Sequence, residues 1–406
     1  MKPIKLSEGI YKLTANVEGL LFEGMWDMPR DAAVNSYIVK GEKTAIIDGF
    51  CDWDGVPEKL FELLDELSID PGTIDYLVIN HMEPDHSGWI RDFKKIRKDF
   101  EVVLTKKAAA MLEAYYGETQ GVRIVKTGDS LDLGGGRVLE FHEAPNVHWP
   151  ETMMTLEKDS MTLFSCDMFG AFGKLERVHF DDEMTGEDRV IFEEEGLRYF
   201  ANVMATFASQ VKKAIDVAEN LNPAVIAPGH GLVWRSDPGE IIATYKRYVD
   251  YALNASGGEI TLLWGSMYGR TEEMVRRVEA LLDASGMVCH SLQLPQTTFG
   301  EVLTRVLASS GVIVAAPTYE YQMFPPVAMA LEEIGRKKLC GRKAFSFGSY
   351  GWATGTEREL EEIMTRYRMK WDFVPGYVFN GRASEEDFTT IEAGVKALVE
   401  KVRQEG

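Results

Sequence analysis

Short apolar runs separated by turn residues fill the chain up to about residue 250. Three of them, Arg137–His142, Thr152–Glu157 and Met161–Cys166, follow one another without a helix-length segment between them, so they predict neighbouring strands. Apolar residues at helical spacing run from Leu60 to Leu67 and again from Phe200 to Leu221, and they predict helices. The pattern therefore indicates a mixed sheet structure whose outer faces are covered by helices.

The segment Asn254–Gly258, with the sequence NASGG, separates this region from a second one. Its residues are small or polar and tolerate left-handed backbone angles, which is typical of a boundary between compact units. We therefore expect two domains, residues 1–253 and residues 258–406.

Beyond this boundary, apolar runs and helical segments alternate strictly. The predicted strands are Glu259–Trp264, Val288–Leu292, Gly311–Ala316, Lys343–Gly348 and an apolar segment near Phe373–Val378. The predicted helices begin at Thr271 and Thr298, after Pro326 and Thr356, and at Glu385. Strands joined by helical crossovers require a doubly wound parallel sheet. The fold class is therefore α/β, and the length of the second domain suits a flavodoxin-like fold.

Composition narrows the possible partners. The 406 residues include 44 Lys and Arg against 64 Asp and Glu, a formal net charge of −20. Such a chain repels phosphate backbones and anionic lipid headgroups, so we expect neither nucleic acid nor a membrane as a partner. No apolar run approaches the roughly 20 residues that cross a bilayer, and the N-terminal segment lacks the apolar stretch of a signal peptide. We expect a cytoplasmic protein.

The cysteines give no metal site of their own. They are Cys51, Cys166, Cys289 and Cys340, and none falls in a Cys-x-x-Cys pair. A local thiolate zinc or iron site, such as that of a rubredoxin module, is therefore not expected.

Four potential metal ligands, His81, Glu83, Asp85 and His86, follow the apolar run Tyr76–Asn80. They lie where a buried strand ends, and loops at strand ends are common places for binding sites. Each residue alone would more often be solvated or cap the following helix. Four such residues within six positions favour a metal site instead.

Three further candidates occupy the same kind of position. His148 and His230 each follow a predicted strand, and Asp167 comes directly after the run Met161–Cys166. Each alone would more often be structural, but their recurrence at strand ends favours convergence on one site. His142 lies two positions before a turn and is expected to be a strand residue or to lie behind the ligands, while His179 and His290 have no ligand-like neighbours. All three are expected to be structural.

These motifs resemble the metallo-β-lactamase fold and, within it, the flavodiiron branch, also called the A-type flavoproteins. Hydrolases of that fold carry His-x-His-x-Asp-His, whereas this chain has the carboxylate of Glu83 in place of the second imidazole. The segments Asn80–Gly88 and His148–Pro150 are similar to the flavodiiron branch almost residue for residue. The resemblance implies a metallo-β-lactamase-like αββα sandwich as the first domain.

The resemblance also implies a non-haem diiron centre. One iron would be bound by His81, Glu83 and His148, the other by Asp85, His86 and His230, with Asp167 bridging them. Three carboxylates against two ferrous ions leave a charge of +1, which one bridging hydroxide neutralises. Imidazole and carboxylate ligands suit iron and manganese and do not exclude zinc. The metal pair itself is expected to perform the chemistry, with no separate acid or base assigned.

The loop after the first strand of the second domain has the composition of a phosphate site. Its residues are Gly265, Ser266, Met267, Tyr268, Gly269, Arg270 and Thr271, and a predicted helix follows at once. Hydroxyls and backbone N–H groups at a helix N-terminus bind phosphate. The loop lacks the Gly-x-Gly-x-x-Gly spacing of dinucleotide sites, which favours a mononucleotide. Taken alone, an ordinary strand-to-helix turn is the alternative interpretation.

Two more loops, rich in hydroxyl, amide and aromatic side chains, follow the third and fourth strands. They comprise Pro317, Thr318, Tyr319, Glu320, Tyr321 and Gln322, and then Gly348, Ser349, Tyr350, Gly351 and Trp352. Ligands of open α/β sheets bind beyond such strand ends, and all three loops resemble the FMN loops of flavodoxins. Glu320 stands where Asn is more common, and Arg270 where a small hydroxyl residue is common. The former would shift the flavin potential, and the latter would add a phosphate contact.

The resemblance covers nearly the whole chain and implies a flavodiiron reductase without a fused rubredoxin. Such an enzyme passes electrons from FMN to the diiron centre and reduces dioxygen to water or nitric oxide to nitrous oxide; the sequence does not choose between the gases. The family implies a head-to-tail homodimer, or a dimer of dimers, in which the flavin of one subunit serves the metals of its partner. The implied electron donor is a rubredoxin or a reduced deazaflavin.

Two other classes of protein remain as alternatives. The first is a zinc-dependent hydrolase of the metallo-β-lactamase fold fused to a flavodoxin-like electron-transfer domain, in which the same histidines would activate water. The carboxylate of Glu83 argues against it. The second is a flavodoxin-like electron carrier whose first domain is only a scaffold.

Overall fold

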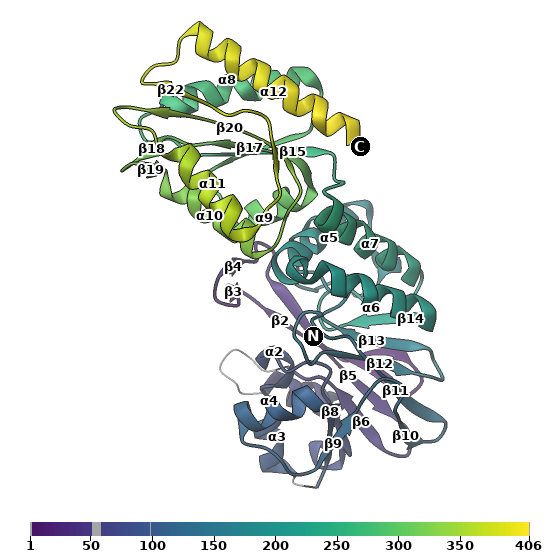
Figure 1. Ribbon diagram of the computed structural model, residues 1–406. Helices are drawn as coiled ribbons and strands as arrows, with labels where there is room; N and C mark the ends of the chain where they lie inside the picture. The colour runs from purple at the N-terminus through teal and green to yellow at the C-terminus, as the bar shows by residue number, and fades with distance from the viewer. Residues whose placement is uncertain (1, 51–57, 98, 406) are drawn as a thin grey trace. The chain divides into compact units, whose positions relative to one another are not determined.

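The computed structural model describes residues 2–50, 58–97 and 99–405 (Figure 1). One compact unit contains the chain up to Phe200 together with Ser209–Lys246, and the other contains Ala201–Ala208 together with the chain from Arg247 onward. The division falls inside helix α7 (Pro238–Asn254), ahead of the linker expected at Asn254–Gly258. The end of α7 belongs with the second unit because Nη2 of Arg342 donates to the carbonyl oxygen of Tyr251 at 2.8 Å. Cys51 lies outside the described residues.

The first unit contains two sheets. The larger has seven strands in the order β1-β2-β5-β6-β7-β8-β9, antiparallel as far as β6 and parallel from there on. Its strands are β1 (Ile4–Ser7), β2 (Ile10–Val17), β5 (Ala32–Lys40), β6 (Thr44–Ile47), β7 (Tyr76–Val78), β8 (Glu101–Thr105) and β9 (Val122–Val125).

The smaller sheet has five strands in chain order. They are β10 (Ser130–Gly134), β11 (Arg137–Glu143), β12 (Met153–Glu157), β13 (Thr162–Cys166) and β14 (Val225–Pro228). Neighbours are antiparallel except β13 and β14, so β11, β13 and β14 all run in one direction. The three strands predicted around residues 137–166 are confirmed as β11, β12 and β13.

Apolar side chains fill two layers of this unit. The layer between the sheets contains Ile10, Tyr37, Ile47, Val78, Leu133, Phe141, Phe164 and Ala227. The other face of the larger sheet packs against α1 (Glu58–Glu66), α3 (Ile90–Ile96) and α4 (Lys106–Tyr116). Helix α6 (Ala208–Leu221) lies beside β14 in Figure 1. The order of helix, sheet, sheet and helix confirms the predicted αββα sandwich.

The prediction of one helix from Phe200 to Leu221 is wrong in its first part. Helix α5 (Gly186–Tyr199) ends at this point, Phe200–Met204 forms a π-helical turn and Ala205–Phe207 a 3₁₀ turn, and α6 begins only at Ala208. The carbonyl oxygen of Asn202 accepts from Nζ of Lys337, so it is engaged outside its own turn. This side-chain partner, distant in sequence, is not visible in the local periodicity.

The second unit is a parallel sheet in the order β16-β15-β17-β20, followed by β21 and β22, which both pair with β20. The strands are β15 (Glu259–Trp264), β16 (Cys289–Gln293), β17 (Ser309–Ala315), β20 (Lys343–Tyr350), β21 (Asp372–Phe373) and β22 (Tyr377–Asn380). Numbered within this unit, the strand order is 2-1-3-4-5, which is the flavodoxin-like order. The predicted doubly wound sheet is confirmed.

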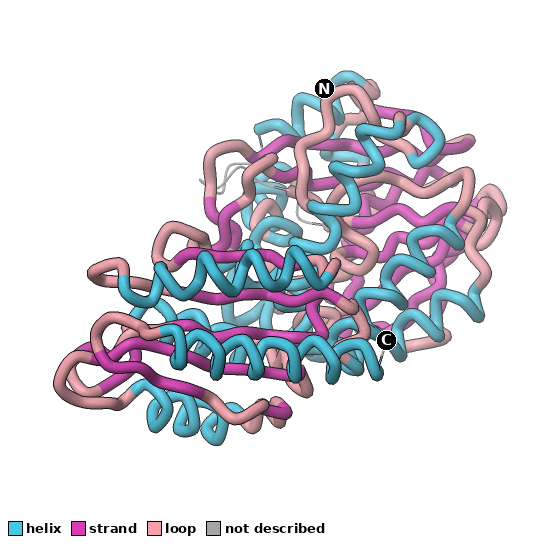
Figure 2. The backbone as a smooth tube through the Cα atoms, turned by 90° about the horizontal axis from the view of Figure 1, so that it is seen from above, coloured by secondary structure: helices cyan, strands magenta, loops and turns pink. Residues whose placement is uncertain are grey.

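Helices cover both faces of this sheet, as Figure 2 shows. Helices α8 (Arg270–Ser285) and α12 (Glu385–Glu405) share an apolar core with β15, β17 and β20. The opposite face is covered by α9 (Phe299–Ala308), α10 (Pro325–Arg336) and α11 (Thr356–Tyr367), as seen in Figure 1. Among the described residues, no helix combines the length and the apolar character that a bilayer crossing requires.

The last strand of the second unit differs from the expected apolar segment near Phe373–Val378. It consists of two pieces: β21 pairs with the beginning of β20, and β22 pairs with its end. Pro375 lies between the pieces and has no N–H to donate to a neighbouring strand. A proline inside an apolar run therefore explains the break.

Candidate functional site

Every predicted metal ligand lies just beyond the end of a strand of the first unit. His81 and Glu83 follow β7, while Asp85 and His86 lie in the short helix α2 (Pro84–Ser87) directly after them. The other three candidates, His148, Asp167 and His230, follow β11, β13 and β14. Because these three strands run in one direction, their carboxyl ends meet at one edge of the smaller sheet.

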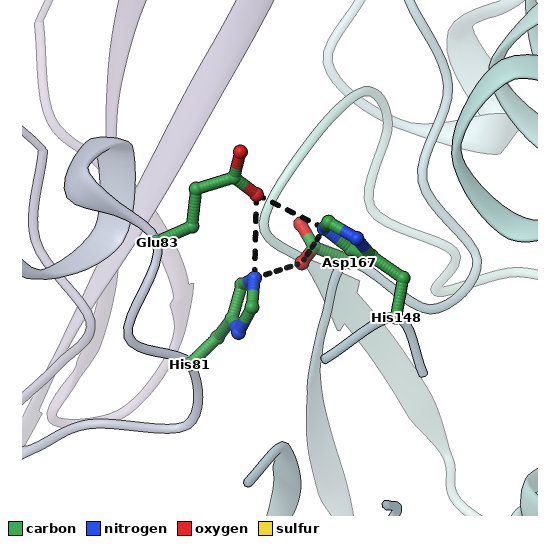
Figure 3. A group of neighbouring side chains, drawn as sticks. All are labelled: His81, Glu83, His148 and Asp167. Carbon is green, nitrogen blue, oxygen red and sulfur yellow. Dashed lines mark hydrogen bonds and ion pairs between the residues drawn. The ribbon is translucent and has the colours of Figure 1, made fainter. Parts of the chain in front are cut away.

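The side chains of His81, Glu83, His148 and Asp167 form one set, with ligand atoms within 4.8 Å of one another (Figure 3). Oε2 of Glu83 lies 3.3 Å from Nε2 of His81 and 2.9 Å from Nε2 of His148. Oδ2 of Asp167 lies 3.2 Å and 3.4 Å from the same two nitrogens. Two imidazole nitrogens and two carboxylate oxygens thus face a common centre.

A second set consists of Asp85, His86 and His230 together with the other oxygen of Asp167. Oδ2 of Asp85 lies 3.5 Å from Nε2 of His86 and 3.4 Å from Nε2 of His230. Oδ1 of Asp167 lies 3.1 Å from each of these nitrogens. The carboxylate of Asp167 therefore directs one oxygen to each set, the arrangement expected of a ligand that bridges two metal ions.

Some of the buried carboxylate oxygens in the two sets lack hydrogen-bond partners, as expected of atoms that bind metal ions. Oδ2 of Asp167 is buried and close to two imidazoles, yet it forms no hydrogen bond among the described residues, and buried Oδ1 of Asp85 has no hydrogen-bond partner there either. Buried polar atoms without partners are rare in proteins. Four imidazole nitrogens and three carboxylates match the preferences of non-haem iron and related divalent metals.

The electrostatics also favour bound cations. Burial disfavours the charged form of His148 and His230, but Asp167, helped by Glu83 and Asp85, raises the pKa of His148 to about 9 and that of His230 to about 10. Burial likewise opposes the ionisation of Glu83, yet the facing imidazoles lower its pKa to about 2. The carboxylates thus stabilise positive charge at this site, which either protonated imidazoles or divalent metal ions can provide.

Several residues that sequence reasoning missed contact the back of this cluster. Nδ1 of His81 donates to Oε1 of Glu151 at 2.8 Å, and Asp48 and Cys166 lie within 4.8 Å of His86. Asp48 directly follows β6, so the strand-end criterion would have found it. Nothing in the local sequence marks Glu151, because only folding brings it behind a histidine 70 positions earlier.

The three histidines expected to be structural lie apart from the two ligand sets. His142 is buried on β11, with Nε2 3.1 Å from Oε1 of Glu140. His290 lies in β16, with Nε2 2.8 Å from Oε2 of Glu259. His179 is half-buried, which lowers the pKa of its imidazole.

A pocket of about 830 Å³ opens onto Glu83 and Asp85. It is lined by the hairpin of β3 (Leu21–Phe22) and β4 (Trp26–Asp27), by Arg91 of α3 and by the end of α4. Its surroundings are partly apolar, since Leu21, Met25 and Tyr115 are each about half exposed. The pocket is far larger than a diatomic gas molecule needs.

In the second unit, the first two predicted loops follow β15 and β17. The third differs from the prediction, because Gly348, Ser349 and Tyr350 form the end of β20 and only Gly351 and Trp352 follow the strand. Oγ1 of Thr271, in the first turn of α8 (Arg270–Ser285), and Oγ of Ser349, near the end of β20, lie 2.9 Å apart, which joins the start of this helix to the end of the strand. The hydroxyls of Thr318 and Thr356 lie 3.1 Å apart, which joins the second loop to α11. The structure therefore brings the three loops together at the point where the strand order reverses, between β15 and β17.

The first loop ends at the N-terminus of α8. Gly269 has φ +81°, and its N–H donates to Oγ of Ser266 at 3.0 Å, closing the turn. Arg270 is exposed, 3.7 Å from Glu273, and the ring of Tyr268 is 88% exposed. Met267 lies between Ser266 and Tyr268 in the sequence. Together with Arg270 and Thr271, the loop offers backbone N–H groups, hydroxyls and a guanidinium at a helix N-terminus.

The second loop forms a hairpin that the sequence did not reveal. After Pro317, β18 (Thr318–Tyr319) pairs with β19 (Gln322–Met323), and the two turn residues Glu320 and Tyr321 both have positive φ. Nη2 of Arg358 donates to the carbonyl oxygen of Tyr321 at 3.0 Å, which fixes the tip. The hairpin was hidden because its turn lacks the glycine or asparagine usual for such angles.

The third predicted loop has open space around Gly351. Trp352 is 84% exposed, and a Cβ on Gly351 would meet nothing within 4 Å. At Gly348, within β20, a Cβ would lie 1.9 Å from the carbonyl oxygen of Ala316, so the residue that follows β17 approaches β20 closely here. Tyr350 is the last residue of β20 and is partly exposed, so two aromatic side chains, Tyr350 and Trp352, lie at this end of the strand.

Known proteins are similar to this chain in sequence and in structure. A family model described as ODP family beta lactamase matches residues 33–231. A nitric oxide reductase of Moorella thermoacetica is 30% identical over 382 residues, 92% of each chain. An anaerobic nitric oxide reductase flavorubredoxin of Vibrio vulnificus is 33% identical over 84% of this chain and 68% of its own length.

The structural match extends over both units. The crystal structure of the flavodiiron protein from Giardia intestinalis superposes with a TM-score of 0.91 and 26% identity, covering 100% of this chain and 98% of that one. A flavoprotein of Thermotoga maritima gives 0.88 and 25%, with 98% of each chain covered. With relatives of this identity matched along nearly their whole length, the chain belongs to the flavodiiron proteins, a family of oxidoreductases.

Proposed function

We propose that this protein is a flavodiiron reductase that uses electrons from FMN to reduce dioxygen to water, nitric oxide to nitrous oxide, or both. The observation that carries this proposal is the carboxylate of Asp167, whose two oxygens face two matched sets of imidazole and carboxylate ligands. The names of the relatives in Moorella and Vibrio support nitric oxide as a substrate.

His81, Glu83 and His148 would hold one iron ion, Asp85, His86 and His230 the other, and Asp167 would bridge them. When bound, the iron pair and FMN can each store two electrons, enough together for the four that dioxygen needs. The three carboxylates, two of them buried, would balance most of the metal charge. Asp85 and Asp167 are almost fully buried, which keeps water from competing with the ligands.

FMN would lie across the three loops of the second unit. The phosphate would bind at the N-terminus of α8, near Ser266, Gly269 and Thr271, with Arg270 adding a positive charge. The aromatic rings of the second and third loops would flank the flavin ring. Glu320, at the hairpin tip, would place a carboxylate near the ring and disfavour its anionic reduced form.

We further propose a head-to-tail homodimer, or a dimer of dimers, as in the family. The large pocket beside Glu83, with exposed Leu21, Met25 and Tyr115 around it, is a suitable surface for the flavin loops of a second copy. A rubredoxin or a reduced deazaflavin would supply electrons, and the cytoplasm remains the expected location. Light scattering should give a dimer mass, and a Tyr115→Arg variant should be monomeric and lose reductase activity while retaining FMN.

The decisive experiment follows both gases with one preparation. The protein is loaded with iron and FMN and reduced without oxygen, and the consumption of dioxygen and nitric oxide is then measured side by side. His81→Ala and Asp167→Ala should abolish both activities while FMN stays bound. Undiminished turnover in these variants would refute the metal centre and support a plain electron carrier. Zinc in the purified protein, together with thioesterase or lactonase turnover, would support the hydrolase alternative instead.

A further inference from the structure

His81 has a charged partner behind its ring. Its Nδ1, the nitrogen facing away from the candidate metal centre, donates to Oε1 of Glu151 at 2.8 Å. Glu151 is only 2% exposed, and the same oxygen accepts the backbone N–H of Met82 at 3.0 Å, so the carboxylate is held in place. Oε2 of Glu151 is buried and has no hydrogen-bond partner among the described residues.

The imidazoles of the other ligand set have weaker acceptors behind them. Nδ1 of His230 donates to the neutral carbonyl oxygen of Ala33 at 2.9 Å. Nδ1 of His86 lies 4.0 Å from Sγ of Cys166, at the limit of a hydrogen bond to sulfur. Asp48 is nearby, but its Oδ1 accepts the backbone N–H of Asn80 at 2.7 Å. Across the described residues, neither imidazole of this set donates its outward N–H to a carboxylate.

The two ligand sets are otherwise matched. Each has two imidazoles, one carboxylate of its own and one oxygen of Asp167. The direct ligands differ only in the carboxylate of each set's own, Glu83 in one and Asp85 in the other. The groups behind the imidazoles differ more, and an anionic acceptor at Nδ1 fixes the imidazole tautomer and makes Nε2 a stronger donor.

We propose that Glu151 is a positioning residue that makes the subsite of His81, Glu83 and His148 the tighter of two unequal metal subsites. The inference rests on the proposed function, because it requires both subsites to bind metal. It adds an order of loading: the first metal ion enters beside His81, and the second enters between His86 and His230.

The test is a titration of the full-length, FMN-replete protein after its metals have been removed with a chelator. Co²⁺ is added without oxygen, and its visible spectrum follows each binding step; Fe²⁺ binding is checked by equilibrium dialysis. The wild-type protein should bind two ions per chain in two separate steps. His148→Ala should remove the tighter step and His230→Ala the weaker one, which assigns each step to its subsite.

Glu151→Gln is the informative variant, because the amide retains the size of the side chain and an acceptor oxygen but loses the charge. We expect it to weaken the tighter step by about 10- to 100-fold and to leave the weaker step unchanged. Glu151→Asp should restore much of the affinity by restoring the charge. Glu143→Gln removes an exposed carboxylate at the end of β11 and is the matched control that should change neither step.

The possible failures are distinguishable. Two steps of equal affinity in the wild-type protein would overturn the inference. Equal weakening of both steps by Glu151→Gln would do so as well, since that result indicates a general loss of structure. Circular dichroism of each metal-free variant shows whether the fold is retained. A protein that binds neither Co²⁺ nor Fe²⁺ would instead overturn the proposed function.

Discussion

Lys12 should destabilise the first unit, and its removal should make the protein more stable. The side chain lies on β2, is fully buried, and its Nζ has no hydrogen-bond partner among the described residues. Glu183 attracts it, but that carboxylate already accepts the backbone N–H of His179 at 2.8 Å. Burial therefore dominates and lowers the pKa of Lys12 from 10.5 to about 7.

The magnitude follows from the size of this pKa shift. At about 1.36 kcal/mol per pKa unit, the lysine costs about 5 kcal/mol of folding free energy below pH 7. Between pH 7 and 10.5 the unfolded chain binds the additional proton, so stability rises with pH over this range. At pH 9.5 the remaining cost is only about 1 kcal/mol.

The perturbation to test is Lys12→Met, which keeps the length of the side chain and removes the amine. Urea denaturation of the metal-free protein, followed by tryptophan fluorescence, should show the variant more stable than wild type by about 5 kcal/mol at pH 6 and by about 1 kcal/mol at pH 9.5. Lys40→Met changes an exposed lysine at the end of β5 and should stay within about 0.5 kcal/mol of wild type at both pH values. A gain from Lys12→Met that is the same at both pH values would refute the reasoning, because a buried charge requires the pH dependence.

Three further outcomes are expected. Arg342→Met should destabilise the second unit by about 3 kcal/mol in urea denaturation, because this fully buried guanidinium donates to backbone carbonyls of α7 and α9 that would lose their partner. Gly348→Ala should reduce the FMN content measured by absorbance, because the new methyl group would clash with the carbonyl oxygen of Ala316. In the metal-free protein, the raised pKa values of His148 and His230 stabilise the fold fully below pH 6.5, and this contribution is lost as pH rises through about 9 to 10. Melting curves of metal-free and metal-loaded protein across this range should show the loss only without metal.

The second unit could be predicted well because its strands are buried on both faces and read as continuous apolar runs. Strand β15 has the predicted bounds at both ends, Glu259 and Trp264. The prediction failed where a single residue altered the backbone hydrogen bonding, as Pro375 does between β21 and β22. The hairpin turn at Glu320 and Tyr321 was not predicted either, because residues other than glycine rarely adopt the positive φ angles found there.

The seven candidate metal ligands could be predicted from their common position at strand ends, and the structure brings all seven side chains together. Their division between two sets came from the family resemblance and could not be derived from spacing. The hydrogen-bond acceptors behind the imidazoles could not be predicted from the sequence. The carbonyl of Ala33 and the carboxylate of Glu151 carry no local pattern and become neighbours of histidines only through long-range packing.

Each ligand set draws from both sheets of the sandwich. His81 and Glu83, or Asp85 and His86, come from the larger sheet, while His148, His230 and Asp167 come from the smaller one. A metal ion bound at either set would therefore also cross-link the two sheets of the first unit. Free metal at 100 times its dissociation constant adds about 2.7 kcal/mol of stability per site. Removal of the metals would thus be expected to loosen the contact between the two sheets as well as to stop the proposed chemistry.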